Sequence, residues 1–81
     1  MAYELIKLAP GSYDLLLNGD IIGSVVRNTS RYLVTWSAEL LLDVPPEQRP
    51  TPFIYIEHEF TTLEEVRAWL GSPGTPNIEG R

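Results

Sequence analysis

The chain has 81 residues and a formal net charge of −5, with 43% hydrophobic and 21% charged residues. This length predicts one domain with a small core, and the composition is that of a globular protein. Disulfides cannot support the fold because the sequence has no cysteine, and an acidic surface repels phosphates and anionic lipids. We therefore expect a cytoplasmic protein that binds neither nucleic acid nor a membrane.

No targeting or membrane segment is expected. The acidic Glu4 and the lack of a basic start before an apolar run argue against a signal peptide. No apolar run approaches the roughly 18 to 20 residues that a membrane helix needs.

The N-terminal residues predict a strand and a tight turn. Residues 3–8 alternate weakly between apolar and polar side chains, which suggests a first strand. Pro10 and Gly11 follow, and these residues favour the second and third positions of a turn. The first strand should therefore pair antiparallel with the next one.

Residues 13–27 predict a β-hairpin, around which the rest of the chain is arranged. Asn-Gly between apolar alternating segments is the strongest local hairpin signal, because both residues tolerate positive φ angles. We expect a three-residue loop with a bulge, since this register collects the apolar side chains on one face. The expected loop comprises Asn18, Gly19 and Asp20. In this register Leu17 pairs with Ile21, Tyr13 pairs with Val25, and Gly23 lies opposite Leu15.

Two further strands are predicted, separated by a loop. Residues 31–42 alternate with a period of two and are rich in β-branched and aromatic side chains at their start. Residues 43–52 contain prolines at 45, 46, 50 and 52, so they should form an extended exposed loop. We interpret this loop as a connector rather than as a proline-rich ligand for an aromatic groove. Residues 53–60 carry a strong strand signal.

A short C-terminal helix is predicted to begin at Thr62. The Thr62 side chain can cap the helix while Glu65 reaches back, and Gly71 ends it. So short a helix needs tertiary packing, and Trp69 is its expected anchor in the core. Apolar side chains follow at helical spacing: Leu63, Val66, Trp69 and Leu70.

Residues 72–81 predict a disordered tail outside the domain, because they are rich in proline and glycine and poor in apolar side chains. The last four, Ile78-Glu79-Gly80-Arg81, form the recognition sequence of the clotting protease factor Xa. A cleaved fusion would leave these residues, so we interpret them as a remnant without function.

These elements predict a single α+β domain over residues 1–71. We expect a four-stranded antiparallel β-meander followed by one short helix packed on one sheet face (β-β-β-β-α). The alternative is a small curled barrel that buries both faces of the sheet.

The sequence does not predict an enzyme, a cofactor site or a metal site. One arrangement could be a metal or catalytic site, and it consists of Glu57, His58 and Glu59. On a strand the two glutamates point to one face and the histidine to the other, so the three cannot converge on one ion. We expect solvated glutamates and a histidine at the edge of the core.

The function expected from the sequence is therefore protein–protein interaction without catalysis, with another protein or as a homodimer, through an apolar sheet face or an edge strand. The alternative is an acidic inhibitor or nucleic-acid mimic that binds a basic partner. The predicted contact residues are those expected on the sheet face away from the helix: Leu16, Ile22, Val26, Leu33, Phe53 and Tyr55.

Overall fold

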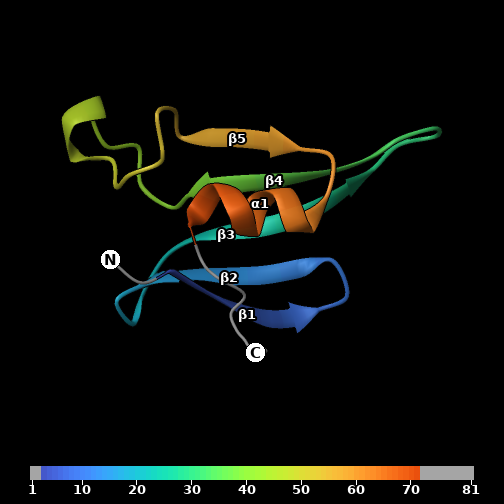
Figure 1. The fold of residues 1–81 in the computed structure, drawn as a ribbon, viewed down its shortest axis with the longest axis horizontal. Coiled ribbons are helices and arrows are strands. Elements are labelled where there is room, and N and C mark those ends of the chain that lie inside the picture. Colours follow the sequence, from blue (N-terminus) through green and yellow to red (C-terminus); the bar gives the residue numbers. More distant parts are fainter. Residues whose placement is uncertain (1–2, 72–81) are drawn as a thin grey trace.

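The computed structural model describes residues 3–71. They form one antiparallel sheet with the strand order β1-β2-β3-β4-β5, followed by a helix (Figure 1). The elements are β1 (Tyr3–Ala9), β2 (Ser12–Leu17), β3 (Asp20–Thr29), β4 (Val34–Leu40), the 3-10 turn η1 (Pro46–Gln48), β5 (Glu57–Phe60) and α1 (Leu63–Leu70). Residues 72–81, where the sequence predicts a disordered tail, lie outside the described residues.

The structure confirms the α+β meander with its C-terminal helix but corrects the number of strands. The sheet has five strands rather than four. The N-terminal segment forms a strand that pairs antiparallel with β2, as the sequence predicts. In the described part of the chain, β1 and β5 are the two edges and do not pair with each other. The sheet is therefore open, and the barrel alternative is wrong.

The hairpin between β2 and β3 turns through two residues rather than the expected three. Asn18 and Gly19 have φ angles of 53° and 90°, which are those of a tight hairpin turn. Leu17 consequently faces Asp20, so the expected pairing of Leu17 with Ile21 is wrong.

A bulge within β3 then restores the predicted register further along the hairpin. Leu16 faces Ile21 whereas Leu15 faces Gly23, so Ile22 is the extra residue. The predicted pair of Tyr13 and Val25 and the position of Gly23 opposite Leu15 are both confirmed.

The strand predicted over residues 53–60 is shortened to Glu57–Phe60. The backbone N–H groups of Ile54 and Tyr55 donate to Nε2 of His58 over 3.1 and 3.0 Å. These bonds fold the backbone at Ile54 and Tyr55 back toward His58, and the segment meets β4 only from Ile56, whose carbonyl accepts the N–H of Leu40 over 2.9 Å. The local strand preference of the segment is therefore overridden.

Helix α1 begins and ends as the sequence predicts. The Thr62 hydroxyl accepts the N–H of Glu65, and Gly71 follows the helix with a left-handed φ of 71°. The Glu65 carboxylate in turn accepts the backbone N–H and the hydroxyl of Thr61 over 2.9 and 2.8 Å. The bond from the Glu65 N–H satisfies one of the donors that the first turn of a helix leaves without partners, and the bonds from Thr61 fix the chain just before the helix.

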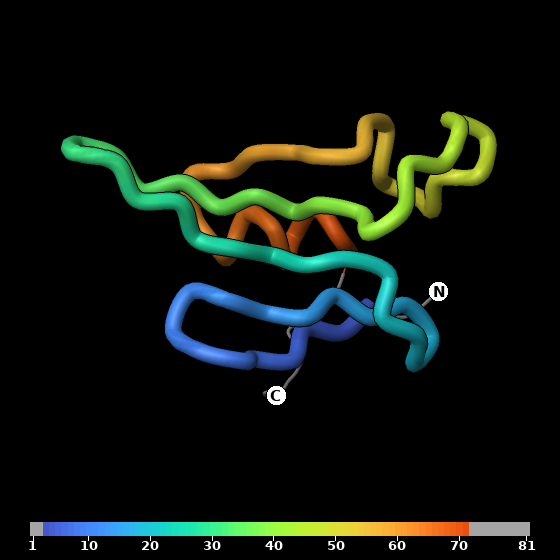
Figure 2. Tube along the Cα trace, turned by 180° about the vertical axis from the view of Figure 1, so that it is seen from behind, coloured from blue at the N-terminus to red at the C-terminus, as the bar shows by residue number. Residues whose placement is uncertain are grey.

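The core lies between α1 and one face of the sheet, here called the covered face. Figure 2 shows the other side, where the strands lie in front of the helix and nothing covers them; this is the open face. Within residues 3–71, no helix has the length and apolar character that a membrane span requires. The buried core residues are Leu15, Val25, Ala38, Leu40, Phe53, Val66 and Leu70.

Candidate functional site

Helix α1 is too short to cover the whole sheet. Its 8 residues span about 12 Å at 1.5 Å per residue, whereas the 10 residues of β3 span about 33 Å. The helix therefore covers the middle of the sheet and leaves a pocket beyond each of its ends. The pocket beyond the C-terminal end lies beside the loop from β4 to β5. Figure 1 shows this loop on the left, next to the C-terminal end of α1.

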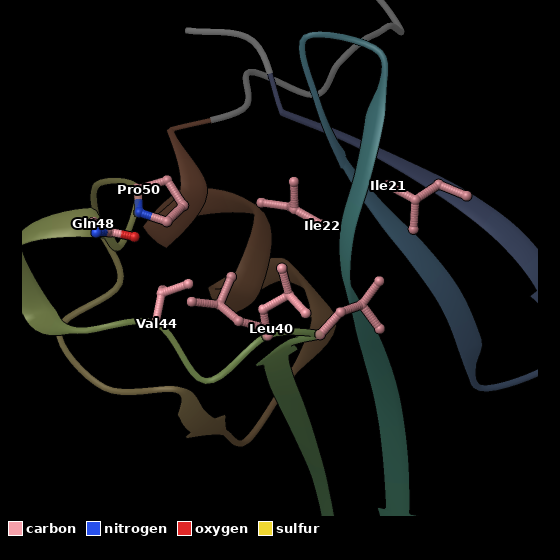
Figure 3. A pocket seen from close by; sticks show the side chains of 8 residues that line it. Ile21, Ile22, Leu40, Val44, Gln48 and Pro50 are labelled. Atoms are coloured by element: carbon pink, nitrogen blue, oxygen red, sulfur yellow. The ribbon is translucent and has the colours of Figure 1, made fainter.

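The pocket at the C-terminal end of α1 is here called the apolar pocket. It has a volume of about 350 Å³. Figure 3 shows Ile22 and Pro50 on opposite sides of it, with Leu40 and Val44 between them, while Ile21 lies across the β3 ribbon. The lining residues are Ile21, Ile22, Leu40, Leu41, Leu42, Val44, Gln48 and Pro50.

Three of these side chains remain largely in solvent. Ile21 is 54% exposed, Leu41 62% and Leu42 71%. Single exposed apolar residues are normal on a protein surface, but a contiguous group around a pocket is typical of an interaction site.

The bulge in β3 brings this group together. The backbone of β4 comes so close to Gly23 that a Cβ atom there would lie 2.2 Å from the carbonyl oxygen of Glu39. Beyond this contact, the N–H of Leu41 donates to the carbonyl of the bulge residue Ile22 over 2.8 Å. The bulge thus directs Ile22 toward the core and leaves Ile21 exposed on the rim of the pocket.

Side-chain hydrogen bonds fix the opposite wall of the pocket, which the loop from β4 to β5 forms. Arg49 donates from Nε to the carbonyl of Val44 over 3.0 Å and from Nη1 to the carbonyl of Ile54. The Tyr3 hydroxyl donates to the carbonyl of Thr51 over 2.7 Å and ties the loop to β1. The loop is thus firmly held, and it contains the 3-10 turn η1 instead of being extended throughout as the sequence predicted. Its role as a connector rather than a proline-rich ligand stays a prediction.

His58 holds the end of the same loop. Its Nε2 accepts the N–H groups of Ile54 and Tyr55, so the imidazole must be neutral with its proton on Nδ1. Its ring lies 4.6 Å from that of Trp69 and 5.8 Å from that of Phe53. Burial against these rings lowers the pKa of the His58 imidazole below its usual value.

The predicted contact residues do not share one face. Leu16 and Val26 lie on the open face, where Leu16 is only 8% exposed. Ile22 packs against the core and lines the apolar pocket, and Phe53 is buried 4.8 Å from the ring of Trp69. Leu33 lies at the tip between β3 and β4, and Tyr55 is exposed beside His58. Partner binding by this set stays a prediction.

Sequence reasoning missed the group formed by Ile21, Leu41 and Leu42. The run of apolar residues at the end of β4 was a visible signal, but its position depends on the bulge and on the β4–β5 loop. Neither of these follows from local sequence patterns.

The open face carries a row of carboxylates beside its apolar side chains. Asp14 pairs with Ser24, which pairs with Glu39, and this residue pairs with Glu57. Partners in a ladder share a face, so these side chains form one row across the sheet. The carboxylates that the register places on this face are Glu4, Asp14, Glu39, Glu57 and Glu59, and it places no lysine or arginine of the described strands there.

The described residues form no cluster typical of a metal centre. No group of three or more His, Asp or Glu side chains among residues 3–71 is arranged to hold a metal ion. The register places Glu57 and Glu59 on the open face and His58 on the covered face, as expected.

Comparisons with protein-family models, curated proteins and solved structures find no match to this chain. The function proposed below therefore rests on the geometry of the site.

Proposed function

We propose that this chain is a small non-enzymatic domain that binds another protein, and that the apolar pocket receives apolar side chains from an exposed segment of that partner. The observation that carries this proposal is the exposure of Ile21, Leu41 and Leu42 around one pocket. The firmly held loop supports it, because a preformed wall lowers the cost of ordering on binding.

The size of the pocket limits the affinity. Fully burying an exposed leucine or isoleucine contributes roughly 1.5–3 kcal/mol, and these side chains are already partly buried. Association itself costs at least about 4 kcal/mol. The pocket is therefore an anchor point, and the complex should be micromolar or weaker unless the partner also contacts the rim.

The charges around the pocket favour a basic partner. Asp20 precedes Ile21 in the chain, Asp43 follows Leu42, and Glu47 precedes Gln48. The nearest cation in sequence is Arg49, whose Nε and Nη1 already donate to loop carbonyls. A segment with apolar side chains next to lysine or arginine would complement both the pocket and its rim.

Selection of peptides from a displayed library, followed by affinity measurement, tests this function. Leu41→Lys should weaken binding of the selected peptides by tenfold or more, because it places a charge on the pocket wall. Leu33→Lys is the matched control: the residue type is the same, Leu33 is 60% exposed where Leu41 is 62%, and it lies at the distant hairpin tip.

The two variants also show which results would contradict the proposal and whether the occupant of the pocket is a second copy of the chain. Equal binding by both variants and the parent would contradict the proposal. Light scattering across a range of concentrations shows whether the occupant is a second copy of the chain, since a dimer built on the pocket would dissociate in Leu41→Lys and persist in Leu33→Lys.

The acidic open face favours a second candidate function, that of an inhibitor or nucleic-acid mimic for a basic protein. Its support is the row of carboxylates without an intervening cation. Binding of this kind would weaken steeply as salt is raised, whereas binding in the apolar pocket would change little. Glu39→Gln combined with Glu57→Gln would weaken the former and spare the latter.

A further inference from the structure

A second pocket lies beyond the N-terminal end of α1, at the opposite end of the covered face; it is here called the basic pocket. Its volume is about 440 Å³. Strands β1 to β4, the β1–β2 turn and the start of the helix all contribute to it. The residues that matter for its chemistry are Lys7, Tyr13, Arg27, Trp36, Thr61 and Glu64.

The β1–β2 turn fixes the position of Arg27. Its backbone N–H donates to the carbonyl of Gly11 over 2.8 Å. Its side chain lies against the same glycine, where a Cβ atom would be 3.1 Å from Nε. Gly11 has a φ of +79°, so the turn that supports the guanidinium group favours glycine for both conformation and space.

The side chains of Lys7 and Arg27 have no polar partner among the described residues. Within residues 3–71, neither side chain forms an ion pair or a hydrogen bond. Of the other described cations, Arg49 donates to loop carbonyls and Arg31 lies 6.0 Å from the ring centre of Tyr32, whereas Arg67 is in the last turn of α1 and does not line this pocket. An acidic protein thus presents two uncommitted cations to one pocket.

The carboxylates at the start of α1 do not cancel these charges. Glu65 turns back to Thr61, and the hydrogen bonds from the Thr61 hydroxyl and backbone lower the pKa of the Glu65 carboxyl. Glu64 is the acidic residue that lines the pocket. The pocket therefore holds two positive groups and one negative group.

Aromatic side chains add two apolar ring faces to the pocket. The rings of Tyr13 and Trp36 lie 6.1 Å apart at 51°. Arg27 and Trp36 are directly opposite each other in the β3–β4 ladder, and Lys7 and Tyr13 are opposite each other in the β1–β2 ladder. Each cation thus lies next to an aromatic ring.

We infer that the basic pocket binds a small organic anion, whose phosphate or carboxylate group pairs with Lys7 and Arg27 while a planar apolar part lies against Tyr13 and Trp36. Cations that are not neutralised within the protein recognise such anionic groups, and aromatic faces accept planar ligands. This site is separate from the apolar pocket and does not depend on the function proposed for it.

A titration followed by NMR tests this inference. The indole N–H signals of Trp36 and Trp69 are recorded while phenyl phosphate, which combines an anion with a ring, is added. Trp36→Phe assigns the two signals. We expect a saturable shift of the Trp36 signal with the Trp69 signal unchanged, because Trp69 lies in the ring cluster with Phe53 and His58. Benzylamine, a cation of similar shape, should give no such shift.

Charge variants identify the residues involved. Lys7→Gln and Arg27→Gln should each weaken phenyl phosphate binding by about tenfold, and Glu64→Gln should strengthen it because it removes the opposing charge. Arg31→Gln is the matched control, with the same change in net charge at the hairpin tip, and should leave affinity unchanged.

Other results would overturn the inference. These are a Trp36 signal that does not respond to phenyl phosphate, an equal response to benzylamine, or an equal loss of affinity in Arg31→Gln and Lys7→Gln. The Trp69 signal in each variant verifies that the core is intact.

Discussion

His58 shows how a single side chain can replace strand hydrogen bonds. It is the only histidine of the chain. Its Nε2 accepts the backbone N–H groups of Ile54 and Tyr55, two residues that would belong to β5 if the strand were longer. A protonated imidazole has no acceptor, so protonation must break both bonds. The loop that forms one wall of the apolar pocket is thereby linked to a titratable group whose pKa burial holds below its usual value.

Stability should fall as the solution becomes acidic, in a window that His58 defines. The folded state holds the pKa of His58 below its unfolded value of about 6.5, so below that pH the unfolded chain binds more protons. The stability that the neutral His58 imidazole contributes is complete above the unfolded pKa, and it is lost as the pH falls toward the pKa of the folded state. Urea unfolding of the parent and of His58→Gln between neutral and mildly acidic pH measures this loss.

Glutamine is the informative replacement, because its side-chain oxygen can accept the same N–H groups and does not titrate. The variant should lose less stability than the parent over this window. Identical pH dependence in the two proteins would show that His58 is not the titrating group.

Gly23 allows β3 and β4 to pack closely, because it has no side chain at a position where β4 leaves no space for one. Its φ lies outside the left-handed region, so the requirement is close approach: a Cβ atom would lie 2.2 Å from the Glu39 carbonyl oxygen. The regular β3–β4 ladder ends at this glycine, opposite Leu40, and the bulge residue Ile22 that precedes it lines the apolar pocket.

Gly23→Ala should therefore destabilise the protein by about 1–3 kcal/mol or more, because the backbone of β4 has to move. Gly19→Ala is the comparison, since no atom lies within 4 Å of its Cβ position and only its φ of +90° opposes a side chain. That strain costs roughly 1–2 kcal/mol. Thermal unfolding of both variants gives the difference, and a smaller loss in Gly23→Ala would contradict the proposed role of this contact.

Local sequence signals predicted most of the elements. The Asn18-Gly19 turn, the Thr62 cap and the Gly71 terminus each follow from the conformational preferences of one or two residues, and the structure confirms them. The helix was also expected to cover only one sheet face, because it is the only helix that the sequence predicts.

The misplaced features depend on arrangements that residue preferences do not indicate. The bulge at Ile22 lies in the β2–β3 pairing next to the close approach of Gly23 to β4, and the start of β5 is set by a turn in which His58, a residue of β5 itself, accepts the N–H groups of Ile54 and Tyr55. Leu41 and Leu42 read as the end of a strand, and only the fold brings them beside Ile21. The candidate site was therefore less predictable than the architecture.

On the scale of the whole molecule, charge and apolar surface are separated by position. The open face carries carboxylates, the pocket near the helix N-terminus carries cations, and the pocket near the helix C-terminus is lined by exposed aliphatic side chains, of which Ile21 lies on the open-face side of β3. The cause is the mismatch between a helix of 8 residues and a strand of 10. A short helix on a long sheet buries the centre of one face and leaves both of its ends available to ligands.

Photo-crosslinking in cells that make the protein tests the central claim most directly. A benzophenone side chain is placed at Leu42, which is 71% exposed on the apolar pocket, and in a second variant at Leu33, which is 60% exposed at the hairpin tip. We predict a discrete crosslinked species from position 42 that is absent from position 33. No adduct at position 42, or the same adducts from both positions, would contradict the assignment of the apolar pocket as the surface that binds the partner.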